Sequence, residues 1–232
     1  MEGMDIGRSF TFVFEDENWI TKVLVGGLFV LLSFVLVGIP FVAGYMLEVI
    51  QRSREDHPEP LPDWSDLGGY FMRGIQVIVV IFVYNLPVIL LSCIAWAVGM
   101  ALGNGGRGGN DAAGLIVLCV NCIILLWSLV MAVFLPAALI KLAETREIMS
   151  GFRFGELWTF IRENLANYII AIVLGWVASF VAMFGIILCG IGLLFTIFWG
   201  YMVQAHLLGQ VARAAVPPAP LAPAETFSPE AV

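Results

Sequence analysis

The sequence predicts an all-α polytopic membrane protein, with about six transmembrane helices arranged as three hairpins, each preceded by an amphipathic surface helix. The first observation is compositional. Of 232 residues, 60% are hydrophobic and 12% are charged, and the mean hydropathy is +0.95. Soluble domains carry about 45–50% apolar and about 25% charged residues. The second observation is a set of apolar runs long enough to cross a bilayer, found around 75–102, 113–140 and 168–203, with an interrupted run at 23–51.

The third observation is a repeated pattern. A charge, an apolar residue, a glycine and an aromatic residue recur in register at 5–10, 66–71 and 153–158, and each copy precedes a long apolar stretch. A repeating unit of this kind determines the architecture before any single residue is interpreted. We therefore expect one membrane domain over 1–213, with repeats at about 5–54, 64–149 and 153–213. The remaining residues, 214–232, are rich in Pro and Ala and are expected to form a disordered cytoplasmic tail.

The first repeat is compressed. Ile6, Phe10, Val13 and Phe14 define the apolar face of its predicted surface helix. As one straight helix, residues 20–50 would be about 46 Å long, which exceeds the hydrocarbon core of about 30 Å. Gly38-Ile39-Pro40 interrupts this stretch, and proline disfavours continuing a helix. The sequence predicts either two short helices in an incomplete hairpin or one long kinked helix.

The other two repeats have the same order of elements. In the second, a short surface segment at 64–72 should precede a crossing from Gly74 to about Leu102, a polar glycine-rich loop at 103–111, and a return helix from Ala113 to about Leu142. In the third, a surface helix over 154–165 should lead into a crossing from Tyr168 to about Leu188, a turn at 190–192 and a return helix from Leu193 to about Arg213.

The basic residues predict the orientation of the chain. If each repeat is a hairpin, ten of them lie on one side: Arg8, Lys22, Arg52, Arg54, Arg73, Lys141, Arg146, Arg153, Arg162 and Arg213. Only Arg107 lies opposite. Since cytoplasmic loops carry the excess of Lys and Arg, we expect a multi-pass protein of the cell (plasma) membrane with both termini in the cytoplasm. The first residues are acidic or neutral, so no cleavable signal peptide is expected.

A polar residue recurs near the cytoplasmic end of each return helix. Pro40 lies eight residues before Glu48, Pro136 lies eight before Glu144, and Gln204 occupies the corresponding position in the third repeat. Because ionisable groups at membrane depth often mark ion or substrate pathways, one interpretation is that these residues converge on a polar site, which takes in the following set: Glu48, Lys141, Glu144, Gln204 and His206. The alternative places them at the interface, with the Lys141 side chain reaching the headgroups and Glu48 paired with Arg52.

Other motifs carry little chemistry. Cys119-x-x-Cys122 lies in an apolar run with neither a second such pair nor a nearby histidine, so we interpret it as packing rather than as a metal or redox site. The GxGxxG string at 103–108 lacks the strand and helix of a nucleotide site. We expect no catalytic residues, no metal, no cofactor, no nucleic-acid partner and no enzymatic activity.

Three segments, Gly44-Tyr45-Met46-Leu47-Glu48-Val49-Ile50, Leu61-Pro62-Asp63-Trp64 and Phe71-Met72-Arg73-Gly74, together with residues 5–10, resemble the DUF4013 family of integral membrane proteins without an assigned function. The resemblance implies a membrane domain and supplies no catalytic residues. The sequence favours a non-enzymatic membrane scaffold or accessory subunit, in contact with the lipid bilayer and with a membrane-protein partner or a second copy. The alternative is a small solute transporter or channel, and an enzyme acting on lipids is a distant third.

Overall fold

The chain consists of helices and connecting loops, without a strand, over the residues that the computed structural model describes, which are 4–103, 107–187 and 190–215. The α-helices are α1 (Ile6–Glu15), α2 (Trp19–Leu32), α3 (Ile39–Arg54), α4 (Leu67–Gly103), α5 (Arg107–Thr145), α6 (Phe154–Glu163), α7 (Leu165–Met183) and α8 (Ile191–Ala214). Short 3-10 helices are η1 (Ser33–Val35), η2 (Ile148–Phe152) and η3 (Phe184–Ile187). The sequence predicts a disordered tail over 214–232; Ala214 is instead the last residue of α8, and residues 216–232 lie outside the described residues.

Four helical stretches are long and apolar enough to cross a membrane: Leu67–Met100, Gly114–Thr145, Leu165–Ile187 and Ile191–Ala214. A fifth crossing results if Ile6–Glu15 and Trp19–Val35, which meet at a bend of 97°, form one broken span. The chain is therefore a multi-pass membrane protein by length and composition. The structure yields four or five such spans, compared with the six expected.

The stretch over residues 20–50 contains two helices rather than one. Helix α2 leads into η1, Leu36 adopts a left-handed φ of 65°, and α3 begins at Ile39 with Pro40 in its first turn, where the missing N–H and fixed φ of proline are tolerated. Helices of 14 and 16 residues are about 21 and 24 Å long. Each is shorter than a hydrocarbon core of about 30 Å.

Helix α4 differs from the expectation. The sequence predicts a short surface helix followed by a separate crossing from Gly74, but α4 runs through Gly74 without a break. The glycine serves a helix contact instead. A Cβ built on Gly74 would lie 1.7 Å from the Pro40 carbonyl oxygen, and one built on Gly44 would lie 1.8 Å from that of Tyr70. Two glycines thus let α3 and α4 cross with their backbones in contact.

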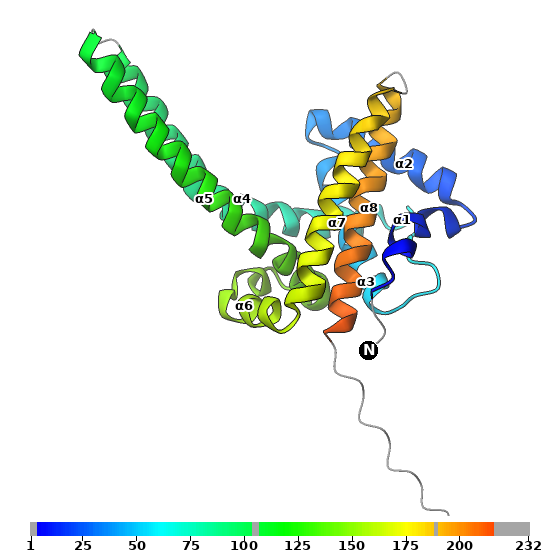
Figure 1. Ribbon diagram of the computed structural model, residues 1–232. Coiled ribbons are helices and arrows are strands. Elements are labelled where there is room, and N and C mark those ends of the chain that lie inside the picture. Colours follow the sequence, from blue (N-terminus) through cyan, green and yellow to red (C-terminus); the bar gives the residue numbers. More distant parts are fainter. Residues whose placement is uncertain (1–3, 104–106, 188–189, 216–232) are drawn as a thin grey trace, which may run out of the picture.

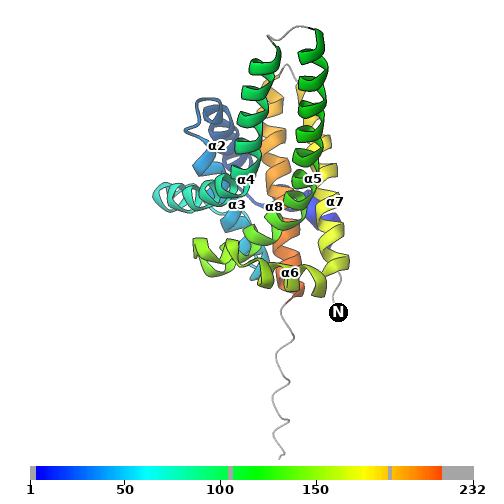
Figure 2. The same ribbon diagram turned by 90° about the vertical axis from the view of Figure 1, so that its left-hand side faces the viewer.

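The outer halves of α4 and α5 form an arm, which we define as residues 85–100 of α4 and 114–134 of α5. Figure 1 shows the two helices running side by side away from α7 and α8, and Figure 2 shows that the first part of α4 lies across the molecule before it turns to run beside α5. Pro87 lies inside α4, and a proline in a helix interior is the usual cause of a sharp bend. At the base of the arm, the Trp127 indole donates a hydrogen bond to the Tyr84 carbonyl oxygen (3.0 Å).

The segment over 153–213 has its helices where the sequence places them. Helix α6 buries Leu157, Phe160 and Ile161, α7 and η3 together cover 165–187, and α8 returns from Ile191. From Met202 to Ala212, every residue of α8 is buried except Gln204, which is partly exposed. A Cβ on Gly209 would lie 2.6 Å from the Ile50 carbonyl oxygen, so α8 also packs closely on α3.

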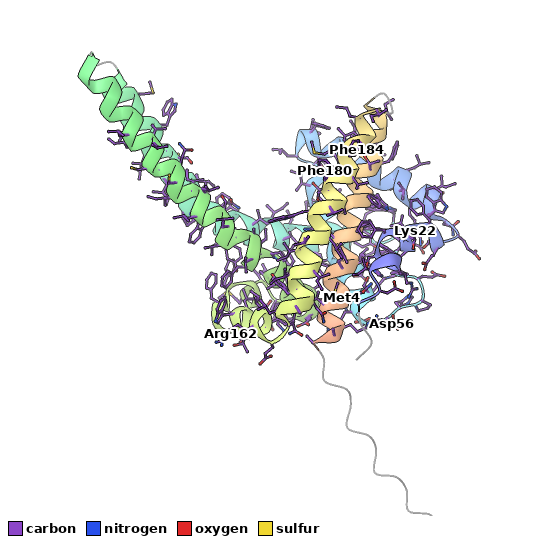
Figure 3. The ribbon with its side chains drawn as sticks, viewed as in Figure 1. Met4, Lys22, Asp56, Arg162, Phe180 and Phe184 are labelled. Carbon is purple, nitrogen blue, oxygen red and sulfur yellow. The ribbon has the colours of Figure 1, made fainter. Side chains whose placement is uncertain are left out.

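The two ends of the molecule differ in chemistry. Figure 3 shows Asp56 and Arg162 at the end where α3, α6 and α8 finish or begin, and Phe180 and Phe184 at the opposite end of α7. The start of α1 also lies at the first of these ends, because the Gln210 amide on α8 donates a hydrogen bond to the Asp5 carbonyl oxygen (3.1 Å). We call this charged end the base.

Candidate functional site

Two of the segments that resemble the family contact one another. Tyr45 on α3 stacks on Trp64, with ring centroids 4.2 Å apart, and its hydroxyl donates to the Pro62 carbonyl oxygen (2.7 Å). The Trp64 indole in turn donates to the carbonyl oxygen of Lys22 on α2 (3.0 Å). The residues at 61–64 therefore form a clamp between α2 and α3, which fixes the first hairpin against the rest of the base.

A largely buried ion-pair cluster joins the clamp to Lys22 of α2. The Lys22 ammonium lies 2.7 Å from an Asp16 carboxylate oxygen and 3.0 Å from one of Asp63, and it donates to the Leu61 carbonyl oxygen (3.0 Å). The Lys22 and Asp16 side chains are 7% and 5% exposed, whereas that of Asp63 is 72% exposed. Three acceptors satisfy the three N–H groups of the ammonium, as a buried charge requires.

Glu48 is the centre of a second cluster, where α3 crosses α4. The Arg73 guanidinium bonds one Glu48 carboxylate oxygen and, at 2.6 Å, a carboxylate oxygen of Asp66. Arg52, one turn along α3, lies 3.6 Å from Glu48, and Arg146 lies 4.0 Å away. The Gly44–Gly74 crossing brings this cluster together, because it holds the two helices at backbone contact. Glu48 is thus compensated by several guanidinium groups.

Glu144 belongs to a third cluster. Its carboxylate accepts a hydrogen bond from the Lys141 ammonium (2.8 Å) and lies 3.3 Å from Arg54 Nε. That nitrogen is buried and has no hydrogen bond among the described residues, although it lies this close to the Glu144 carboxylate. The Lys141 ammonium also lies 5.0 Å from the centre of the Phe160 ring, a cation–π distance. These groups line a cavity of about 520 Å³ between α5, α6 and the ends of α3 and α8.

His206 is buried between α1 and α8. Its Nδ1 lies 3.1 Å from the Ser9 hydroxyl, its ring stacks on Phe12 at 4.3 Å, and Gln210 donates to the same hydroxyl (3.0 Å). Ser53 Oγ and Gln210 Oε1 are buried without a hydrogen-bond partner among the described residues. They line a cavity of about 20 Å³, which is large enough for one water molecule. The network ties the N-terminal helix to α8.

Gln204 lies in a different environment. It lines an apolar cavity of about 540 Å³ bounded by α2, α3, α4, α5 and α8. Its side chain passes close to α7, because a Cβ on Gly175 would lie 3.4 Å from Gln204 Cγ. Pro136 of α5 and Tyr201 of α8 line the same cavity.

The structure therefore brings together one pair from the predicted set, Lys141 with Glu144. Glu48, Gln204 and His206 lie in three other places, each with different neighbours. Spacing along the chain correctly relates Glu48 to Arg52 but does not identify Arg73, Lys22 or Ser9 as partners. The family-like segments carried a signal for two of these pairs. Asp63, which pairs with Lys22, and Arg73, which pairs with Glu48, both lie within those segments. Among the described residues, no three His, Cys, Asp or Glu side chains are grouped as metal ligands.

One comparison with known proteins gives a match. A family described as "Protein of unknown function (DUF4013)" matches residues 27–191. The matched range includes the clamp, the Glu48 and Glu144 clusters and the whole arm. No curated protein and no solved structure matches the chain.

Proposed function

Because the chain belongs to the DUF4013 family, whose description assigns no function, we propose its role from its own geometry, as a non-enzymatic membrane scaffold or accessory subunit. In this proposal, ion pairs hold the helices of the base together, and the arm projects from the base into the membrane. A rigid base with a projecting helical arm can hold another membrane component at a fixed place in the bilayer.

The observation that carries this proposal is the local neutralisation of the charges at the base. Glu48 is matched by Arg73 and Arg52, and Glu144 by Lys141 and Arg54. A carboxylate that already binds guanidinium groups is a poor carrier of ions, because each transfer must break those pairs. Paired charges of this kind support a structural role.

The transporter alternative draws support from one feature. The apolar cavity that Gln204 lines has a volume of about 540 Å³, which lies within the range of about 300–1,000 Å³ typical of ligand sites. A transported solute would have to pass Gln204, since this residue supplies one of the polar side chains of the cavity wall.

Liposome reconstitution separates the two roles. We expect the purified protein to move ions and small solutes no faster than protein-free vesicles, and we expect Gln204→Leu to leave that rate unchanged. In the host membrane, native electrophoresis should place the protein in assemblies larger than its own dimer. A solute flux that the wild type supports and Gln204→Leu abolishes would contradict the scaffold role and establish the alternative.

We further propose that both termini are cytoplasmic and that α2 and α3 form a re-entrant hairpin. Both helices are too short to span, and the base contains most of the basic residues, as the cytoplasmic side of a plasma-membrane protein does. The full count of six crossings in three repeats would require α2 and α3 to span instead.

Cysteine labelling tests this topology in a chain whose native cysteines are replaced. In intact cells, a membrane-impermeant maleimide should label Arg107→Cys, whereas Arg162→Cys should react only after permeabilisation. Leu36→Cys at the tip of the first hairpin should resist the reagent from both sides. Labelling of Leu36→Cys in intact cells would show that α2 and α3 span, and labelling of Arg162→Cys there would reverse the orientation.

A further inference from the structure

The arm is apolar except along two regular series of residues. Over residues 85–100 of α4 and 114–134 of α5, the only amide or hydroxyl side chains are Asn85, Ser92, Asn121 and Ser128. Asn85 and Ser92 are seven residues apart, as are Asn121 and Ser128, and a glycine continues each series at the same interval, Gly99 on α4 and Gly114 on α5. Residues seven apart share a helix face, since the drift is only about 20° per heptad.

Both series lie on the same flank of the hairpin. On α4, the polar residues Asn85 and Ser92 directly follow Tyr84 and Leu91 in the sequence. On α5, Asn121 and Ser128 directly follow Val120 and Trp127. These four preceding residues are more buried than their neighbours in the series, and they form the seam between the two helices. When two antiparallel helices are viewed from the same end, successive residues turn anticlockwise on one helix and clockwise on the other. The residue that follows a seam residue therefore points to the same side of the hairpin on both helices.

The two series also match in depth. The bond from Trp127 to Tyr84 fixes the register, so residues whose numbers add to about 211–213 lie at the same level. From the base to the tip, Asn85 is level with Ser128, Ser92 is level with Asn121, and Gly99 is level with Gly114. Each polar level of the arm thus presents one amide and one hydroxyl, and the third level presents two glycines.

Toward the base this flank continues into the lining of the cavity beside α8, at Ile81 and Leu135. Farther out along the arm, no contact within the described chain uses it. The Asn85 and Asn121 amides donate to the carbonyl oxygens of Ile81 and Val117 on their own helices, at 2.7 and 2.8 Å, which leaves the two amide oxygens without a donor among the described residues. The Ser128 hydroxyl likewise donates within its own helix, to the Ile124 carbonyl oxygen (2.8 Å). A polar group without a partner in hydrocarbon is costly. A Cβ on Gly99 or Gly114 would meet nothing within 4 Å among the described residues.

A glycine in a helix interior costs about 0.5–1 kcal/mol relative to alanine, and here no contact inside the chain requires either one. Small residues of this kind in membrane helices are typical of surfaces where another helix approaches closely. The polar levels and the two glycines are independent features, and both lie on the flank that the chain leaves uncovered.

We propose that this flank binds the same flank of a second copy of the chain, so that two arms form a four-helix bundle about a two-fold axis parallel to the arm. The two-fold axis places α4 of one copy against α5 of the other. Asn85 then faces Ser128 of the other copy, Ser92 faces Asn121, and the glycines meet at the tip. An amide faces a hydroxyl at both polar levels, so the surface is complementary to itself, as an isologous interface must be.

Lipid tails offer the amide oxygens no hydrogen-bond donor, whereas a second copy offers a serine hydroxyl at each polar level. Ser92 can donate directly, and Ser128 can donate when its hydroxyl rotates away from the Ile124 carbonyl oxygen. Buried asparagines are known to set register and partner number between helices. The pairing depends only on the arm lying in the bilayer. It therefore goes beyond the proposed function and holds for a scaffold or a transporter alike.

Disulfide trapping tests the geometry. Two differently tagged, cysteine-free copies are co-expressed, one carrying Gly99→Cys and the other Gly114→Cys, and the membranes are oxidised. We expect a cross-linked dimer with both tags. The matched control uses Leu90→Cys with Ile123→Cys, which are level with each other on the opposite flank and are 61% and 49% exposed. Equal cross-linking of the two pairs, or cross-linking of the control pair alone, would overturn the proposal.

Fluorescence energy transfer between purified copies in liposomes tests the affinity as lipid is added. Gly99→Leu with Gly114→Leu, or Asn121→Leu alone, should raise the dissociation constant by about tenfold or more, since interhelical hydrogen bonds and close packing drive association in membranes. The glycine variants should unfold at or above the wild-type temperature, because the new side chains enter open space. Energy transfer no greater than random proximity for the wild type, or unchanged affinity in the variants, would refute the interface.

Discussion

Gly74→Ala is expected to destroy the fold of the base. The new Cβ would lie 1.7 Å from the Pro40 carbonyl oxygen, and that neighbour is backbone, so no side-chain rotation relieves the clash. Helices α3 and α4 would have to separate, and the Glu48–Arg73 pair would separate with them. We expect a loss of stability above the usual overpacking cost of about 1–3 kcal/mol. Tryptophan fluorescence during thermal unfolding in detergent would measure it, and Gly44→Ala should behave alike.

Gly68→Ala and Gly155→Ala are the matched controls. Both glycines are helical, and a Cβ at either position would meet nothing within 4 Å among the described residues. Their unfolding temperatures should equal or slightly exceed that of the wild type, because alanine favours the helix. A Gly74→Ala protein that is as stable as these controls would show that α3 and α4 do not cross at backbone contact.

The helices over 153–213 could be predicted from the sequence because their boundaries are local. An apolar face at helical spacing marks α6, and Gly190, with a φ of 75°, marks the turn before α8. Such signals depend only on neighbouring residues. The break at Gly38 and Pro40 could be predicted for the same reason, although the choice between two helices and one required the structure.

The helices over 64–149 could not be predicted as well, because the role of a glycine depends on what lies beside it in space. Gly74 looks like the end of a surface segment, yet it is a contact point inside α4. Similarly, Pro87 and Pro136 stand inside long helices rather than at their ends. In a membrane bundle, neighbouring helices can satisfy the groups that such residues leave free.

The candidate site shows the same limit. Equal spacing from a proline places Glu48 and Glu144 at comparable positions on their helices, but the direction in which each points depends on helix packing. Glu48 faces α4, whereas Glu144 faces Arg54 and the cavity beside α6. The Lys22 cluster joins residues 41 positions apart, Lys22 and Asp63, and no periodicity reports a contact at that separation.

The second large effect of a single substitution is expected at Lys22, the centre of the ion-pair cluster beside the clamp. Lys22→Met removes the cation from a cluster in which the Asp16 side chain is only 5% exposed. The remaining carboxylate would be buried without a counter-charge, and breaking a buried pair in this way costs about 3–5 kcal/mol. We expect a loss of this size in reversible unfolding in mixed micelles.

Two further variants show whether burial of the charge is the cause. Asp63→Asn removes the partner that is 72% exposed, so it should cost no more than about 1 kcal/mol. Adding Asp16→Asn to Lys22→Met should restore part of the stability, because the stranded charge is then gone while the asparagine oxygen can still accept the Asn18 N–H that Asp16 binds at 2.8 Å. If Asp63→Asn were as damaging as Lys22→Met, the exposed pair rather than the buried one would carry the stability. If the double variant were no more stable than the single one, the cluster would owe its effect to the hydrogen bond that Lys22 donates to the Leu61 carbonyl oxygen. In that case the base would be stabilised by the Leu61 carbonyl contact rather than by paired charge.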